Sequence, residues 1–329
     1  MMITTWKNLS QTKRNKYIGI FTFVAILLAS LSSSDSIIDF LCRLVCYMLF
    51  AEAVNIILGF GGLRPLGQGT YFGFSAYCYL FLVVRAHVPL GMAFLCALVL
   101  TLLLSAFIGY LSLKTNDDLA FAFMNMGINV FLWTLVQKMQ IVGSDTGITG
   151  AVRLPFATGV RANFYVCFAI CTICIIIIYF FFHSPFATVL KGSRENLERL
   201  TFIGINTRNV RLVAYMVSSF FCAVAGLCYA MRNMGAFPTM LSSNTSLDGL
   251  IMCLIGGMYS FFGPLLGALI ITAINVLLPI FTMYYQFVLG AIIVLCVLFL
   301  QGGLLRDKVG KELDDPKKKY VVTGREVAK

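Results

Sequence analysis

The chain has 329 residues, of which 59% are apolar and only 12% are charged. Soluble globular domains carry about 25% charged residues, so this composition excludes a soluble protein. A membrane-spanning helix needs about 20 mainly apolar residues, so the apolar side chains would fill about nine or ten such helices and leave no room for an additional soluble domain.

A hydropathy scan in chain order predicts an all-α integral membrane protein, a polytopic bundle with about ten transmembrane helices. The predicted spans are 17–34, 37–58, 70–86, 88–113, 119–140, 162–183, 211–232, 247–259, 262–281 and 284–303. The eighth, 247–259, is too short for a full crossing and contains a glycine pair. We therefore expect it to be short or broken and to be supported by neighbouring protein.

Ten crossings place both termini on one side of the membrane. With that side cytoplasmic, 19 of the 25 Lys and Arg residues lie inside, as the positive-inside rule requires. A cleaved N-terminal secretory signal would break this parity, so we expect an uncleaved first helix. The predicted regions are a cytoplasmic tail at 1–16, a transmembrane domain at 17–303 with a charged cytoplasmic segment at 184–211, and a basic cytoplasmic tail at 304–329.

Motifs for catalysis are missing from the sequence. There is no G-x-x-x-x-G-K-[ST] phosphate loop, no H-E-x-x-H and no G-x-S-x-G. The two histidines, His87 and His183, fall at predicted span ends. Cys167, Cys171 and Cys174 reproduce an iron–sulfur spacing, but they lie in an apolar helix and are interpreted as packing residues. We expect no enzymatic activity and no metal site, and the placement of the basic residues argues against nucleic acid as a partner.

The segment 55–77 is unusually rich in residues that break helices. Seven prolines and glycines occur between positions 59 and 73. Such backbone is tolerated in a membrane only beside protein or a water-filled cavity. The alternative is an ordinary cytoplasmic turn.

The segment 184–211 is the only long charged stretch between predicted spans. Ser193 can cap a short helix, Leu197 and Leu200 form an apolar edge, and Gly204 can end it. This pattern favours an amphipathic helix that inserts into a groove of a partner protein. A helix lying on the membrane surface is the alternative.

The segment 254–267 is rich in small residues, which allow helices to approach closely. Pro264 suits the first turn of the following helix. The alternative is a tight hairpin.

Taken in order, these segments resemble the permease subunits of bacterial ABC importers of the branched-chain amino-acid class, most closely the Liv-type subunit of the M kind, over roughly 37–303. The first signature of that family, G-x-x-G-L-x-x-L-G-x-x-x-x-F-G-x-x-A-Y, is matched by Gly59, Gly62, Leu63, Leu66, Gly67, Phe72, Gly73, Ala76 and Tyr77. The second, G-G-x-x-S-x-x-G-P-x-x-G, is matched by Gly256, Gly257, Ser260, Gly263, Pro264 and Gly267. Ala225 and Gly226 match the helix that follows the coupling segment. Gln68 replaces a common His of the family, and Arg199 and Leu200 replace small residues.

The resemblance implies a multi-pass permease of the bacterial cytoplasmic membrane, surrounded by lipid and with both termini cytoplasmic. Its partners would be a homologous permease subunit, two subunits that bind ATP and Mg, and an extracytoplasmic solute-binding protein. The chain itself would bind no cofactor. The coupling to the ATPase would be made by Arg194, Glu195, Asn196, Leu197, Glu198, Arg199 and Leu200. The loop 143–161 would help to dock the solute-binding protein.

The leading cargo implied by the resemblance is a hydrophobic amino acid such as leucine, isoleucine or valine. The same class also serves urea, short amides and other amino acids. Outside this class, a self-contained carrier or channel would work without ATP. A membrane-embedded enzyme using Glu52 would need a second catalytic group at the same depth, and none is found.

Polar residues inside the predicted spans are candidates for the translocation path, because ionisable groups in a membrane are costly. Arg43 has Asp39 one turn earlier, which predicts a structural ion pair. Glu52 has no such neighbour. We expect Glu52 to face the path or the partner permease, and the alternative is a protonated, hydrogen-bonded Glu within the bundle. The candidate path residues are Glu52, Asn55, Gln68, Ser75, Asn125, Asn129 and Asp248.

Overall fold

The computed structural model describes residues 35–114, 117–150 and 159–281, and the single residues 284, 287, 290, 291 and 304. The main helices are α2 (Asp35–Asn55), α3 (Gln68–Leu80), α4 (Leu90–Ser112), α5 (Asp118–Lys138), α6 (Val160–Phe182), α7 (Pro185–Glu195), α8 (Leu197–Phe202), α9 (Thr207–Asn233), α10 (Ser243–Gly256) and α11 (Phe262–Phe281). Shorter elements are the π-helical turns η1 (Ile56–Phe60) and η2 (Phe81–Arg85), the 3-10 turns η3 (Gln140–Val142), η4 (Ser144–Thr146) and η5 (Pro238–Leu241), and the strands β1 (Ile148–Thr149) and β2 (Gly235–Ala236).

Six helices of the described residues are long and apolar enough to cross a membrane. They are α2 with η1, α4, α5, α6, α9 and α11. This confirms the prediction of a polytopic helical membrane protein. The predicted spans at 17–34 and 284–303 and the tails at 1–16 and 304–329 lie outside the described stretches of chain.

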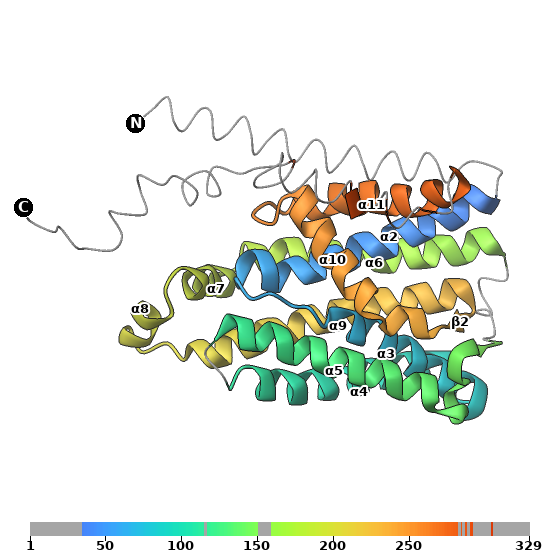
Figure 1. The fold of residues 1–329 in the computed structure, drawn as a ribbon, viewed down its shortest axis with the longest axis horizontal. Coiled ribbons are helices and arrows are strands. Elements are labelled where there is room, and N and C mark those ends of the chain that lie inside the picture. Colours follow the sequence, from blue (N-terminus) through green and yellow to red (C-terminus); the bar gives the residue numbers. More distant parts are fainter. Residues whose placement is uncertain are drawn as a thin grey trace, which may run out of the picture.

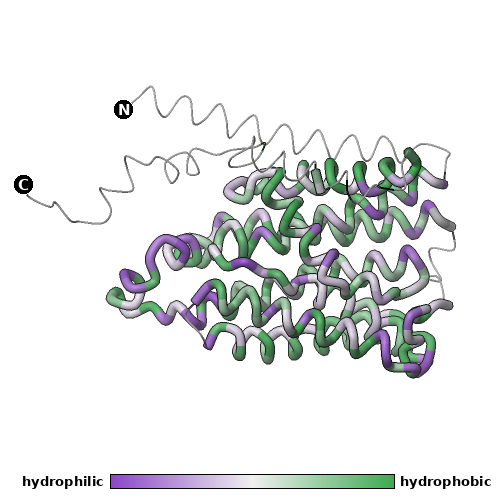
Figure 2. Tube along the Cα trace, viewed as in Figure 1, coloured by the Kyte–Doolittle hydropathy of each residue, from purple (hydrophilic) through white to green (hydrophobic). Residues whose placement is uncertain are grey.

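The long helices form a bundle with two distinct ends (Figure 1). Helices α7 and α8 project at one end, and β1 pairs with β2 in antiparallel fashion at the other. Hydrophilic residues gather at both ends, with a more apolar middle (Figure 2). On the outside, large apolar side chains of α4, α5 and α6 are exposed, such as Leu103, Phe131 and Phe180. Such faces suit contact with lipid.

Helix α9 lies in the middle of the bundle and packs on α2, α3, α4 and α6. It approaches α3 closely at Gly226. A Cβ at this position would lie 2.7 Å from the carbonyl carbon of Phe72 and closer still to its oxygen. Because both atoms belong to backbone, only glycine permits this crossing, which buries Phe72 completely.

Two helices begin inside the bundle. Helix α3 starts at Gln68, after a non-helical stretch that runs inward from η1 (Figure 1). Helix α10 starts at Ser243 and has 14 residues. It is therefore about 21 Å long at 1.5 Å per residue, shorter than the roughly 30 Å hydrocarbon core of a bilayer. The expectation of a short helix at 247–259 is confirmed, with its bounds shifted to Ser243–Gly256.

The two internal helix starts meet beside Asn129, which lies near the middle of α5. The Nδ2 of Asn129 donates to Thr70 Oγ1 at 2.8 Å and to the carbonyl of Leu241 at 2.9 Å. Ser243 Oγ donates back to Asn129 Oδ1 at 3.1 Å. Both breaks therefore lie near the middle of the bundle and against protein, where polar groups of each find a partner on Asn129.

Candidate functional site

The charged segment 184–211 folds as two helices rather than one. Ser184 caps α7 by accepting from the Ala187 amide at 3.3 Å. Helix α7 ends at Glu195, and Asn196 is extended and caps α8 by accepting from the Arg199 amide at 3.1 Å. The prediction that Ser193 caps this helix was wrong. Ser193 is a buried residue inside α7, because the turn after α6 offers an earlier cap.

Arg194 points into the bundle from α7. Its guanidinium donates to the carbonyl of Gly59 and lies 4.8 Å from the ring centroid of Tyr259. Its aliphatic stem covers Gly62, whose φ is +72°. A Cβ at Gly62 would be 3.0 Å from that of Arg194, so glycine is needed both for the backbone angle and for the contact. Arg194 thus joins α7 to both signature segments, and we call this set of contacts the Arg194 latch.

A second connection fixes α7 to the spans. Arg211 of α9 donates to the carbonyl of Ser193 at 3.2 Å and to Asp118 Oδ1 at 3.3 Å. Arg211 is buried, whereas the side chain of Asp118 is half exposed. Helices α5, α7 and α9 are therefore held together at the α8 end of the bundle.

Helix α8 presents its side chains outward. Glu198 and Arg199 are exposed, and Phe202 and Ile203, at the end of the helix, are 89% and 75% exposed. These two large apolar side chains were missed by the sequence analysis. The sequence does indicate them, because Phe202 and Ile203 are two adjacent large apolar residues in a charged segment between predicted spans.

Six of the seven candidate path residues are buried and lie at several places in the bundle, whereas Asp248 of α10 is partly exposed. Gln68 is buried at the start of α3, and neither end of its amide has a partner within the described residues. Ser75 donates to the carbonyl of Ala223 at 2.9 Å. Asn125 accepts from the Tyr215 hydroxyl, which in turn lies 2.7 Å from that of Tyr71. Asn125 and Asn129 thus belong to one buried polar region between α3, α5 and α9.

Glu52 and Asn55 lie on the opposite side of this region, where α2 packs on α10. Both are fully buried. The Asn55 amide is 3.4 Å from the carbonyl of Ser260. Neither carboxylate oxygen of Glu52 has a hydrogen-bond partner among the described residues. Its role in the path stays a prediction.

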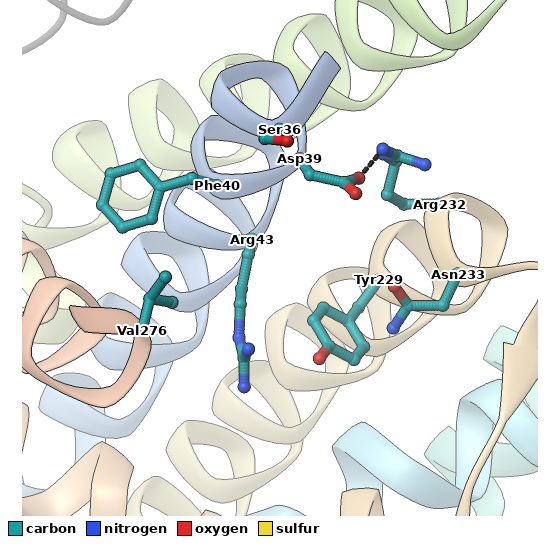
Figure 3. A pocket seen from close by; sticks show the side chains of 8 residues that line it. All are labelled: Ser36, Asp39, Phe40, Arg43, Tyr229, Arg232, Asn233 and Val276. Carbon is teal, nitrogen blue, oxygen red and sulfur yellow. Dashed lines mark ion pairs between the residues drawn. The ribbon is translucent and has the colours of Figure 1, made fainter. Parts of the chain in front are cut away.

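Asp39 does not pair with Arg43. It forms an ion pair with Arg232 of α9 (Figure 3), which corrects the expectation of an i, i+4 pair within α2. Arg43 instead lies 5.8 Å from the ring centroid of Tyr47. The reason is that α9 crosses α2 near this end and offers Asp39 a partner from another helix.

The thiols Cys167 and Cys171 are fully buried, and Cys167 lies 3.6 Å from the carbonyl of Cys228 on α9. Among the described residues, no group of three or more His, Cys, Asp or Glu side chains is arranged to hold a metal ion. The buried position of these thiols favours the packing interpretation.

Comparison with known proteins now identifies the family. The family model described as the permease component of branched-chain amino acid transport systems matches residues 36–297. The chain belongs to this permease family. It is 23% identical to the high-affinity branched-chain amino acid transport system permease protein LivM of Salmonella typhimurium, over 90% of this chain and 76% of that protein.

Other relatives of the permease differ in what their names say they carry. The LivM protein of Escherichia coli is also 23% identical, over 83% of this chain and 70% of its own length. The autoinducer 2 import system permease protein LsrC of Photorhabdus laumondii is 25% identical, over 41% of this chain and 42% of its own length. No solved structure matches the permease. These relatives are transport permeases, not enzymes.

Proposed function

We propose that this permease is the membrane-spanning subunit of an ATP-driven importer that takes up branched-chain or related hydrophobic amino acids. It would pair with a homologous permease, two subunits that bind ATP and Mg, and an extracytoplasmic solute-binding protein. The α8 end would face the cytoplasm of a bacterial cell and the β2 end the exterior. The chain would bind no cofactor itself.

The observation that carries the proposal is the exposed surface of α8. Phe202 and Ile203 protrude next to Glu198 and Arg199. Apolar anchors with charges at their edge are the pattern of a helix that docks in a groove of another protein. Large side chains of this kind supply most of the binding energy at such interfaces. A pair of ATPase subunits is the occupant that the family predicts.

The Arg194 latch supports a mechanism for this docking surface. A push on α8 would reach α7 through Asn196, and α7 is held to the Gly59 carbonyl and to Tyr259. Gly59 lies in η1, before the non-helical stretch that leads to α3, and Tyr259 lies in the turn between α10 and α11. Movement of the ATPase would therefore act on the two broken helices, whose internal ends meet at Asn129.

The test is recovery of ATPase subunits with the tagged permease, co-expressed with its neighbouring genes and purified in mild detergent. Changing both Phe202 and Ile203 to Asp should abolish the recovery. Ile141, which is 63% exposed and lies in η3 at the opposite end, provides the control. Ile141→Asp should leave the recovery unchanged.

Uptake into proteoliposomes identifies the cargo. The complete complex with its solute-binding protein should import labelled leucine, isoleucine or valine only when ATP is supplied. Import of a sugar or of urea instead would leave the importer proposal standing and replace the cargo. A permease that purifies alone and moves solute without ATP would refute the importer proposal and favour a secondary carrier.

A further inference from the structure

A cavity of about 270 Å³ lies between α2, α9 and α11 near the β2 end of the bundle (Figure 3). Pockets that hold drug-sized molecules measure about 300–1,000 Å³, so this one suits a smaller solute. Side chains of three different helices line it. It is separate from the α8 surface and from the latch at the other end.

The charges of this cavity are arranged in two levels. Asp39 and Arg232 form their ion pair at the outer level, where the Asp39 side chain is 62% exposed. Arg43 lies one helical turn deeper and extends along α9 beside Tyr229 (Figure 3). Among the described residues, no carboxylate lies within ion-pair distance of Arg43, although Asp248 of α10 attracts it at longer range.

An arginine inside a membrane-spanning helix is costly and marks a functional site by default. The guanidinium of Arg43 has five N–H donors in a fork that matches a carboxylate. Tyr47 lies beside this guanidinium, with 5.8 Å from its ring centroid to the Arg43 carbon, and it is also a hydrogen-bond partner of Arg43. One such partner occupies only part of the five-donor fork, so the other Arg43 donors are suited to an anionic group that enters the cavity.

The opposite wall of the cavity is apolar. Phe40 of α2 and Val276 of α11 form it. A cation at depth, an anion at the mouth and an apolar wall are together complementary to a zwitterionic α-amino acid with an apolar side chain. Asp39 can accept from an ammonium group while it keeps Arg232, because a carboxylate has about four acceptor sites.

We propose that this cavity is a binding site for the transported amino acid on the permease, with its carboxylate on Arg43, its ammonium on Asp39 and its side chain against Phe40 and Val276. The inference rests on the proposed function, since it takes the solute to be an amino acid. The position near the β2 end would make it the first site that the solute meets after leaving the solute-binding protein.

The experiment measures binding of labelled leucine to the complete transporter in lipid nanodiscs, without the solute-binding protein. We expect Arg43→Gln to weaken binding at least about tenfold, the loss that follows removal of a charged hydrogen-bond donor. Asp39→Asn should also weaken it. The control is Arg85→Gln, because Arg85 is an exposed arginine of η2 outside the cavity, and it should leave the affinity unchanged.

A second variant keeps every charge in place. Val276→Phe fills the apolar side of the cavity, so it should weaken binding of leucine more than binding of alanine. This variant also tests the inference if Arg43→Gln does not assemble. Assembly of each variant is checked by gel filtration of the purified complex.

Two results would overturn the inference without refuting the proposed function. One is unchanged leucine affinity in both Arg43→Gln and Val276→Phe while the wild-type complex still imports leucine, which would leave the proposed function intact. The other is native mass spectrometry showing that Arg43 retains an anionic phospholipid that leucine does not displace, which would make the cavity a headgroup site. A wild-type complex that imports no amino acid would refute the proposed cargo and this inference with it.

Discussion

Removing the Arg194 latch should uncouple ATP hydrolysis from leucine import. In Arg194→Met the aliphatic stem stays over Gly62, but the guanidinium is lost. The hydrogen bond from a charged donor to the Gly59 carbonyl contributes about 1.5–3 kcal/mol, and the contact with the ring of Tyr259 about 0.5–1 kcal/mol at a half-exposed site. Water can solvate the freed carbonyl, so we expect a net loss of about 2–3 kcal/mol.

A loss of this size is about a 30- to 150-fold change in the equilibrium between the latched and unlatched arrangements. It also corresponds to a fall of roughly 3–4 °C in the thermal unfolding midpoint of a chain of this length. Because α8 is unchanged, ATPase subunits should still bind and hydrolyse ATP. The assay is therefore the number of leucine molecules imported per ATP hydrolysed in proteoliposomes, together with the unfolding midpoint.

The matched control is Arg208→Met. Arg208 of α9 donates to the carbonyl of Tyr110 at 3.1 Å and lies 4.8 Å from the centroid of its ring. These are the same two kinds of contact as in the latch, but they join α9 to α4 and touch neither signature segment. Arg208→Met should destabilise by a comparable amount and keep the coupling. Equal import per ATP in wild type and Arg194→Met, or an equal loss in both variants, would refute the latch.

Three further predictions concern the buried interior. Gly226→Ala should lower the unfolding midpoint of the purified permease by about 1–4 °C, since overpacking against the Phe72 backbone costs about 1–3 kcal/mol. Gly91→Ala is the control, and it should leave the midpoint unchanged because nothing lies close to that position. Asn129→Leu should destabilise by about 1–3 kcal/mol, because it leaves buried groups at both helix starts without partners, and a midpoint equal to that of wild type would contradict the network. Glu52→Gln should leave the midpoint unchanged or raised, as a buried carboxylate without partners becomes a neutral amide; full leucine uptake at normal expression would exclude Glu52 from the path.

The structure explains why the two signatures and the charged segment occur in one chain. Gly59 and Gly62 of the first signature and Tyr259 of the second meet on the side chain of Arg194. Taken alone, each segment has a simpler explanation: a turn for 55–77, a tight hairpin for 254–267 and a membrane-surface helix for 184–211. Their meeting point gives them a shared structural role, which is to fix α7 to the segment before α3 and to the turn after α10.

Long apolar runs and dense glycines act locally on the chain, so the sequence alone predicts the class of protein, the six long apolar helices among the described residues and the short helix near 247–259. It also locates the charged segment, but not the start of its helical part, because Ser184 caps α7 and Ser193 lies inside that helix. The sequence does not show which segments Arg194 contacts. The periodicity of apolar residues predicts one face of a helix, but not which other segment packs on that face. The pairing of Asp39 with Arg232 and the sharing of Asn129 by the starts of α3 and α10 become visible only in the folded chain. Both depend on contacts between segments far apart in the chain, which are set by how the helices cross.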